Sequence, residues 1–265
     1  MTTSLEFGLD TFGDVTRDAA GAPLSHAQVI RNVIDEAVLA DELGIDFIGL
    51  GEHHRADFAI SAPEVVLAAI AARTTWQGKL RAPLNNQLVF PPIEHGRLKT
   101  WIGVGGSPES VVRAARYDLP LMLAIIGGDP KRFAPYVELY HRAFKQLGRP
   151  VKPIGVHSPG YVADSDEQAR EELFADYKAM RDRIGRERGW PPMGRDEFVR
   201  EADHGSLYVG SPETVARKIA ATVKALGIAR FQLKYSAGPL PHERLMRSIE
   251  LYGRKVVPLV RDMVA

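Results

Sequence analysis

Short apolar segments alternate with longer amphipathic segments along this chain of 265 residues, and no other feature restricts its possible folds as much. Each apolar segment has the length of a buried strand, and each amphipathic segment suits a helix that returns the chain to the starting edge of the sheet. Consecutive strands then run parallel. The sequence predicts an α/β fold in one domain, residues 1–265, with six strands at residues 5–9, 47–50, 100–104, 121–126, 153–157 and 228–234.

The composition limits both the environment and the partners of the chain. Hydrophobic residues make up 45% and charged residues 25%, as in a water-soluble protein with a sizeable core. A formal net charge of +1 gives no electrostatic reason to expect nucleic acid or a membrane as a partner. The lack of cysteine excludes disulfides, thiolate metal ligands and cysteine nucleophiles. With no signal peptide and no apolar run of roughly 20 residues, we expect a cytoplasmic protein.

The residues after the second strand carry the strongest catalytic signal. The apolar residues 47–50 are followed by a glycine and then by Glu52, His53, His54 and Arg55. Ligands bind at the carboxyl ends of strands in parallel α/β folds, and an imidazole that titrates near neutral pH can transfer protons. We therefore take His53, Glu52 and His54 as candidate catalytic residues. The alternative is one packed histidine beside one solvated histidine.

The same spacing argues against a metal site. Neighbouring side chains on an extended backbone point to opposite sides, so we expect Glu52 and His54 to share a face and His53 to project from the other. The two histidines then cannot easily bind one metal ion, and no third ligand lies at a diagnostic spacing. We predict no metal.

The tetrapeptide Gly-Ser-Pro-Glu occurs twice, at residues 106–109 and 210–213, each time before a helix. Serine at the N-cap, proline in the first turn and glutamate near the positive end of the dipole explain the second copy as a helix start. In the first copy, Gly105 and Gly106 follow a strand directly. The amides of Gly105, Gly106 and Ser107 therefore predict a phosphate site, although the spacing is not that of a Rossmann fingerprint.

Other strand ends carry weaker signals. Gly127 and Gly128 follow the strand at 121–126, where the backbone either approaches a ligand closely or turns before the next helix. His157 and Lys234 end two further strands and would lie on the same rim if the sheet closes into a barrel. No serine lies in the Gly-x-Ser-x-Gly context of a nucleophile elbow.

Five motifs together resemble the bacterial luciferase-like family of flavin-dependent monooxygenases, and the similarity extends over nearly the whole chain. They are Phe-Gly-Leu-Asp-Thr-Phe-Gly at 7–13, Gly-Glu-His-His-Arg at 51–55, Trp-Ile-Gly-Val-Gly-Gly-Ser-Pro-Glu-Ser at 101–110, Ala-Ile-Ile-Gly-Gly-Asp-Pro at 124–130 and Val-Gly-Ser-Pro-Glu-Thr-Val at 209–215.

The resemblance implies a TIM-type (β/α)8 barrel, commonly dimeric, that binds reduced FMN, or in some branches F420, at its C-terminal rim. It places His53 at the flavin, where it supports oxygen chemistry. It assigns the flavin phosphate to Gly105, Gly106 and Ser107, and a close approach to the cofactor to Gly127 and Gly128. A small organic substrate, O₂ and a flavin reductase are the implied partners.

The chain departs from the family between the helix ending near Arg73 and Trp76, where members usually carry two further β/α units. At roughly 30 residues per unit, about 60 residues are missing. Six strands cannot close an eight-stranded barrel. Either the chain lacks these units and the barrel is open, or Thr75 and Trp76 are the ends of two stretches separated by a gap. Continuity of the backbone between these residues distinguishes the two.

The sequence thus favours a flavin-dependent monooxygenase that uses reduced FMN and O₂, with His53 handling protons. The alternatives are a non-catalytic flavin-binding relative and a metal-dependent hydrolase that uses Glu52, His53 and His54. The substrate, and the choice between FMN and F420, are not determined by the sequence.

Overall fold

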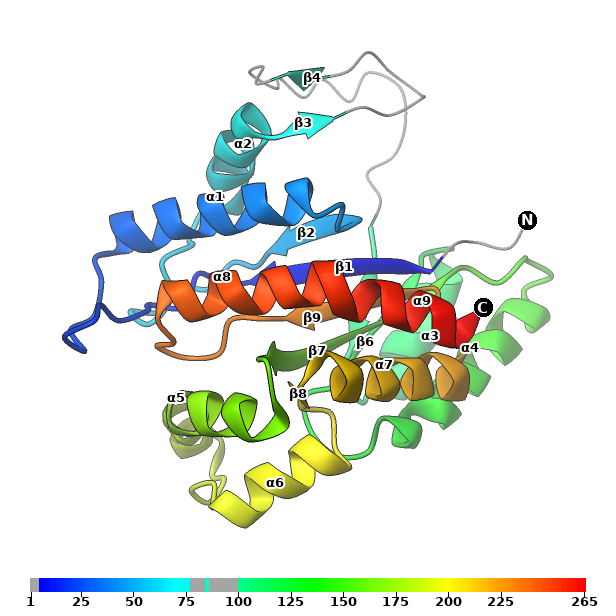
Figure 1. Cartoon of the computed structure of the whole chain (residues 1–265). Helices are drawn as coiled ribbons and strands as arrows, with labels where there is room; N and C mark the ends of the chain where they lie inside the picture. The colour runs from blue at the N-terminus through cyan, green and yellow to red at the C-terminus, as the bar shows by residue number, and fades with distance from the viewer. Residues whose placement is uncertain (1–4, 77–83, 86–99) are drawn as a thin grey trace.

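The computed structural model describes residues 5–76, 84–85 and 100–265, which form an α/β fold around a curled parallel sheet (Figure 1). The strands are β1 (Glu6–Thr11), β2 (Phe47–Leu50), β3 (Thr75–Trp76), β4 (Leu84–Asn85), β5 (Ile102–Val104), β6 (Leu121–Ala124), β7 (Ile154–Val162), β8 (Tyr208–Gly210) and β9 (Arg230–Lys234). The helices are α1 (His26–Glu42), α2 (Pro63–Arg73), α3 (Pro108–Arg116), the 3₁₀ turn η1 (Pro130–Phe133), α4 (Ala134–Gln146), α5 (Asp166–Arg188), α6 (Arg195–Asp203), α7 (Pro212–Leu226), α8 (His242–Leu251), the π-helical turn η2 (Tyr252–Val256) and α9 (Val257–Val264).

The main sheet contains all six predicted strands in the order β2-β1-β9-β7-β6-β5, and every pairing is parallel. Their carboxyl ends therefore lie along one edge. A seventh strand, β8, pairs with the end of β7 through Gly160–Val162 and was missed in the sequence. Tyr208–Gly210 is only three residues long and runs directly into the Ser211 cap of α7, so it carries no strand periodicity of its own.

Apolar side chains of the central strands form the core against the helices that cover the sheet. Phe7, Leu121, Val156 and Phe231 are fully buried and come from four different strands. In Figure 1, α8 and α9 lie across β1 and β9, and α7 lies beside them. Burial of this apolar surface supplies the main stabilising term for such a layered fold.

Between β2 and β5 the sheet of the described residues is open and forms a curled half-barrel, in agreement with the expectation that six strands cannot close an eight-stranded barrel. Only six strands lie side by side, and β8 extends β7 instead of closing the circle. Thr75 and Trp76 are consecutive residues of β3, which pairs antiparallel with β4 in a separate sheet. The sequence over residues 74–92 suggests an irregular or hairpin segment without a helix, and its residues 77–83 and 86–92 lie outside the described residues.

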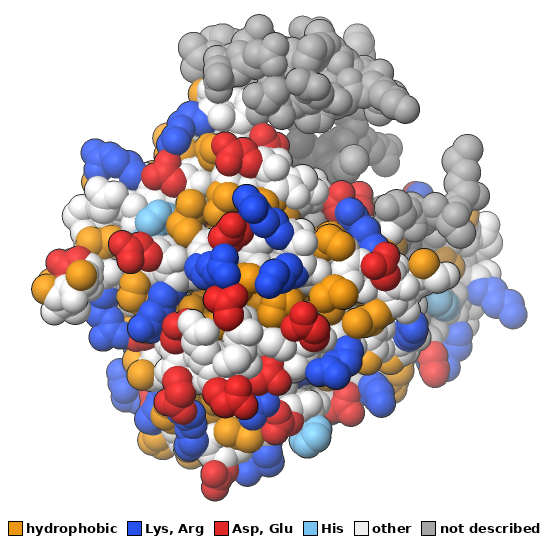
Figure 2. All heavy atoms as spheres, viewed as in Figure 1, with side chains coloured by type: hydrophobic (Ala, Val, Ile, Leu, Met, Phe, Trp, Pro, Cys, Tyr) orange, Lys and Arg blue, Asp and Glu red, His pale blue; other side chains and the backbone are white. Residues whose placement is uncertain are grey.

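Charged side chains of both signs are interspersed over the face that Figure 2 shows, in keeping with the net charge of +1. No helix within residues 5–76, 84–85 and 100–265 is both long enough and apolar enough to cross a bilayer.

The buried carboxylate of Glu36 links α1 to Tyr235, the residue after β9, and to His242 of α8. Glu36 of α1 accepts a hydrogen bond from the Tyr235 hydroxyl at 2.6 Å, and its other oxygen lies 2.8 Å from Nδ1 of His242 in α8. The hydrogen bond to Glu36 raises the pKa of His242 above its ordinary value of 6.5, although burial opposes the shift. The protonated imidazole is therefore favoured in the folded state.

This contact predicts a pH-dependent stability. Because the folded pKa of His242 exceeds the unfolded one, its stabilisation is complete below about pH 6.5 and is lost as the pH rises through the folded value. Thermal unfolding followed by circular dichroism should show a Tm component that falls over this range in the natural protein. His242→Gln should remove that component. An identical pH slope in both proteins would contradict the assignment.

Candidate functional site

A cavity of about 240 Å³ opens at the carboxyl edge of the sheet, where the ends of β1, β2, β6, β7 and β9 meet α5. The sequence analysis predicted the site at this edge of the sheet. Its lining residues are Phe12, His53, Phe58, Ile126, His157, Pro159, Tyr177, Met180, Arg181, Ile184, Arg188, Trp190 and Lys234, and we call it the rim cavity.

His53 lies in the wall of the rim cavity between two aromatic rings. Its ring centroid is 4.3 Å from that of Phe12 and 4.8 Å from that of Phe58, and its backbone N–H donates to the carbonyl of Ile60 at 3.2 Å. Burial lowers the pKa of His53 below 6.5, and the positive charges of Arg55 and Lys234 lower it further. The imidazole is therefore neutral at pH 7 and can either accept or donate a proton at a ring nitrogen.

Glu52 and His54 project from the other side of the loop, as predicted. Nε2 of His54 lies 2.5 Å from Oε1 of Glu52, and both side chains are exposed. Neither residue lines the rim cavity, so only His53 of the three candidate catalytic residues does. The three side chains do not converge on one point. The described residues also contain no group of three or more histidine or acidic side chains placed to hold a metal ion.

Ion pairs hold the loop that carries His53 against α5. The guanidinium of Arg55 donates to both carboxylate oxygens of Glu187 at 2.7 Å and to Asp57 at 3.2 Å. Arg183 of α5 also pairs with Asp57. A bidentate arginine–carboxylate contact has a defined geometry, so α5 and this loop are positioned together as walls of the cavity.

A buried ion pair between Asp14 and Lys234 lies beside the rim cavity, which Lys234 lines. Nζ of Lys234 donates to Oδ2 of Asp14 at 3.1 Å and to the backbone carbonyl of Ser236. Oδ2 of Asp14 also accepts from the Ser236 hydroxyl at 2.6 Å, and its Oδ1 accepts from the amide of Gly238 at 3.0 Å. The pair joins the loop after β1 to the loop after β9.

A second imidazole faces the cavity from β7. Nδ1 of His157 lies 3.2 Å from Oδ1 of Asp10 on β1, across the intervening strand β9. Side chains from alternate strands meet in the same way in the layers that fill TIM barrels. Oδ1 of Asp10 is buried, and this contact lacks hydrogen-bond geometry, so the oxygen has no hydrogen-bond partner among the described residues.

The predicted phosphate loop lies at the end of β5, on the same edge of the sheet as His53. The Ser107 hydroxyl accepts from the amide of Ser110 at 3.3 Å, which caps α3, and donates to Glu109 at 2.8 Å. Gly106 has a φ of +136°, and a Cβ built on Gly105 would meet no atom within 4 Å. The backbone at Gly105 is thus open to approach. Its role in binding phosphate stays a prediction.

Gly127 and Gly128, which follow β6, differ in how accessible their backbone is to a ligand. Gly127 lines a cavity of about 560 Å³ that adjoins the rim cavity, and a Cβ there would meet no atom within 4 Å. The amide of Gly128 donates to both carboxylate oxygens of Glu201, at 3.0 and 3.1 Å, and its φ is +74°. Only Gly127 therefore presents an open backbone, and contact of either glycine with a cofactor stays a prediction.

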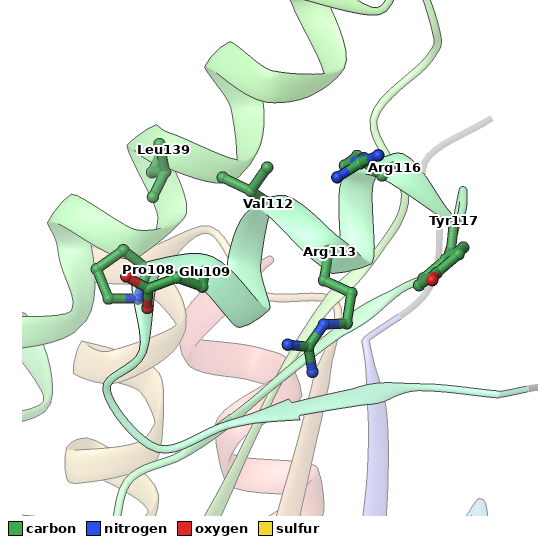
Figure 3. A pocket seen from close by; sticks show the side chains of 7 residues that line it. All are labelled: Pro108, Glu109, Val112, Arg113, Arg116, Tyr117 and Leu139. Atoms are coloured by element: carbon green, nitrogen blue, oxygen red, sulfur yellow. The ribbon is translucent and has the colours of Figure 1, made fainter.

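A larger hollow of about 580 Å³ lies on the outer surface of α3 and α4 (Figure 3). It is lined by Pro108, Glu109, Val112, Arg113, Arg116, Tyr117 and Leu139. None of these residues is a histidine, whereas two histidines line the rim cavity.

The sequence pointed to some of these residues and missed others. His157 and Lys234 were noted only as strand ends, although both line the rim cavity. Phe58, Tyr177 and Trp190 were not considered, because aromatic residues in a loop, a charged helix and a helix-ending turn carry no site signal. Only the chain path brings them to one cavity.

The match to a family model fits this geometry. Residues 11–75 and 74–230 match the model described as luciferase-like monooxygenase, and the two segments meet at Thr74 and Thr75, next to the predicted junction. The chain belongs to this family, whose members are flavin- or F420-dependent oxidoreductases, mostly monooxygenases. No curated protein matches the chain.

Solved structures of three proteins illustrate the likeness of fold. Monooxygenase RslO1 from Streptomyces bottropensis aligns with a TM-score of 0.72 and 18% identity over 96% of this chain and 99% of its own. The oxygenating constituent of 3,6-diketocamphane monooxygenase from Pseudomonas putida, in complex with FMN, gives 0.70 and 17% over 96% and 99%. An F420-dependent secondary alcohol dehydrogenase with an F420–acetone adduct gives 0.64 and 12% over 98% and 100%.

The buried pair beside the cavity yields a stability prediction. Asp14→Asn keeps the shape of the side chain but leaves the Lys234 ammonium without its counter-charge, which should lower the free energy of unfolding by about 3–5 kcal/mol. Urea unfolding measures the change. Glu138→Gln, on the exposed face of α4, is the control and should stay within about 0.5 kcal/mol of the natural protein. Equal stabilities of the two variants would refute the structural role of the pair.

Proposed function

We propose that this protein is a flavin-dependent monooxygenase that uses reduced FMN and O₂ on a small organic substrate. The observation that carries the proposal is the neutral imidazole of His53, enclosed by Phe12 and Phe58 in a cavity at the carboxyl edge of the sheet. Membership of the luciferase-like family supports the reaction class. A flavin reductase as electron donor and a homodimeric assembly are part of the same proposal.

The residues at this edge fit a flavin. The adjoining cavity of about 560 Å³ shares Ile126, Tyr177, Arg181 and Trp190 with the rim cavity and would take the planar ring, which leaves the rim cavity beside it for the substrate. The open backbone at Gly105 and Gly127 offers amides to an anionic tail. Glu197 and Glu201, which also line the adjoining cavity, are paired with Arg181 and with the amide of Gly128. These residues would hold the cofactor, which supplies the redox chemistry when bound.

The side chains of the chain itself would then control protons and water. His53 is neutral and would accept or return a proton at a ring nitrogen. His157 lies 3.2 Å from Asp10 and would present a second imidazole to the same cavity. The rings of Phe12, Phe58 and Tyr177 exclude water from both imidazoles, which strengthens electrostatic interactions inside the cavity.

F420 is the alternative cofactor, because one of the similar structures contains it. The open edge between β2 and β5 favours the second candidate function, a flavin-binding protein without catalysis, because the strands absent there would supply part of a closed rim. Titration with FMN and with F420, each followed by its absorption spectrum after desalting, identifies the cofactor. Binding of neither would overturn both functions.

His53 and His54 form a natural pair for testing catalysis. His53→Ala should reduce flavin-dependent oxygen consumption, measured with NAD(P)H and a flavin reductase, by about 10²–10⁴-fold while the Kd for flavin changes little. His54→Ala, which alters an exposed imidazole outside the cavity, should retain the natural rate. Flavin binding without oxygen consumption in the natural protein would favour the non-catalytic function. Equal rates in the two variants would reject the role of His53.

A further inference from the structure

We propose that the rim cavity binds the organic substrate as an amphiphilic anion, with its apolar body in the cavity and one carboxylate or sulfonate group on Arg188. This assignment deepens the proposed function, because the bound anion would be the substrate of that oxidoreductase.

The charge of the lining is of one sign. The charged side chains that line the rim cavity, those of Lys234, Arg181 and Arg188, are all cationic, and none of the described acidic residues lines it. A cleft with charges of one sign and low-dielectric walls concentrates ligands of the opposite sign. An anionic ligand is therefore favoured over a neutral or cationic one.

Arg188 is the cation of the lining that is free to pair with a ligand. Lys234 is neutralised by Asp14. Arg181 donates to Glu197 at 2.9 Å and to the carbonyl of Pro191 at 2.7 Å. Arg188, in contrast, has no hydrogen bond to an acceptor among the described residues, and its recorded contact is the ring of Trp190. Its five donors are available for bidentate binding of a carboxylate or sulfonate.

The turn after α5 holds this guanidinium at the cavity. Gly189 ends the helix in the left-handed conformation with a φ of +70°, and the amide of Trp190 donates back to the carbonyl of Gly185 at 2.9 Å. The Trp190 ring then lies 5.1 Å from the guanidinium carbon of Arg181 and 5.2 Å from that of Arg188. Cation–π contact of this kind limits the rotamers of Arg188 and lowers the entropy lost when an anion binds.

The remaining walls suit an apolar body. Met180, Ile184 and Ile126 line the cavity, and Ile126 is 55% exposed although it is a large aliphatic residue. The volume of about 240 Å³ lies below the range of roughly 300–1,000 Å³ for drug-sized ligands, so the body must be small. With its charge at Arg188, such a molecule would extend toward the imidazoles of His53 and His157.

Octanoate and 1-octanol test the proposal because they share a chain and differ in charge. Isothermal titration calorimetry of the cofactor-free protein should give a Kd for octanoate at least tenfold lower than for 1-octanol. Arg188→Ala should raise the octanoate Kd at least tenfold and change the octanol Kd less than twofold, and Arg188→Lys should give an intermediate value. Arg186→Ala removes an exposed arginine of the same helix that does not line the cavity, and should leave both values unchanged.

Three results would overturn the proposal. The first is equal affinity of the natural protein for octanoate and 1-octanol. The second is an octanoate Kd that Arg188→Ala and Arg186→Ala change equally. The third is a tenfold loss of FMN affinity in Arg188→Ala with riboflavin affinity unchanged, which would assign the arginine to the cofactor phosphate. Arg188-dependent octanoate binding in a protein that binds no flavin would instead support the anion site while the proposed monooxygenase function fails.

Discussion

The buried ion pair between Asp14 and Lys234 is the contact on which the candidate site depends. It joins the loop after the first strand to the end of the last strand of the sheet, beside the cavity. A charge in this environment is tolerated only with a partner and with its remaining hydrogen-bonding capacity satisfied, and Ser236 and Gly238 complete the set around Asp14. Phe12, two residues before Asp14, is thereby held against His53.

Because the sheet is open, elements other than strand ends must enclose part of its carboxyl edge. A closed barrel surrounds its carboxyl edge with strand ends, whereas here β2 and β5 have no neighbour on one side within the described residues. The helix α5 compensates on the side of His53, because Arg55 and Arg183 fix it to the loop after β2. The cavity is therefore built from residues of five strands, or of the loops that follow them, together with α5 and the turn after it.

Two kinds of local information were readable in the sequence. The strand–helix alternation gave the six strands of the main sheet, because burial on both faces produces short apolar runs. The alternation of side chains along an extended backbone separated His53 from Glu52 and His54. The three-residue strand β8 was missed because its pairing with β7 depends on a partner about 50 residues away in sequence, not on local pattern.

The sequence by itself determined the fold class, the edge of the sheet that carries the candidate site and the separation of His53 from Glu52 and His54, because each follows from periodicity within a few residues. Only the tertiary structure decided which groups meet there. His157 meets Asp10 across β9, Lys234 meets Asp14, and Arg188 lies over Trp190 without a hydrogen bond to an acceptor among the described residues. These outcomes depend on contacts between segments far apart in the chain, and pairing between such segments is set by how the strands and helices pack together.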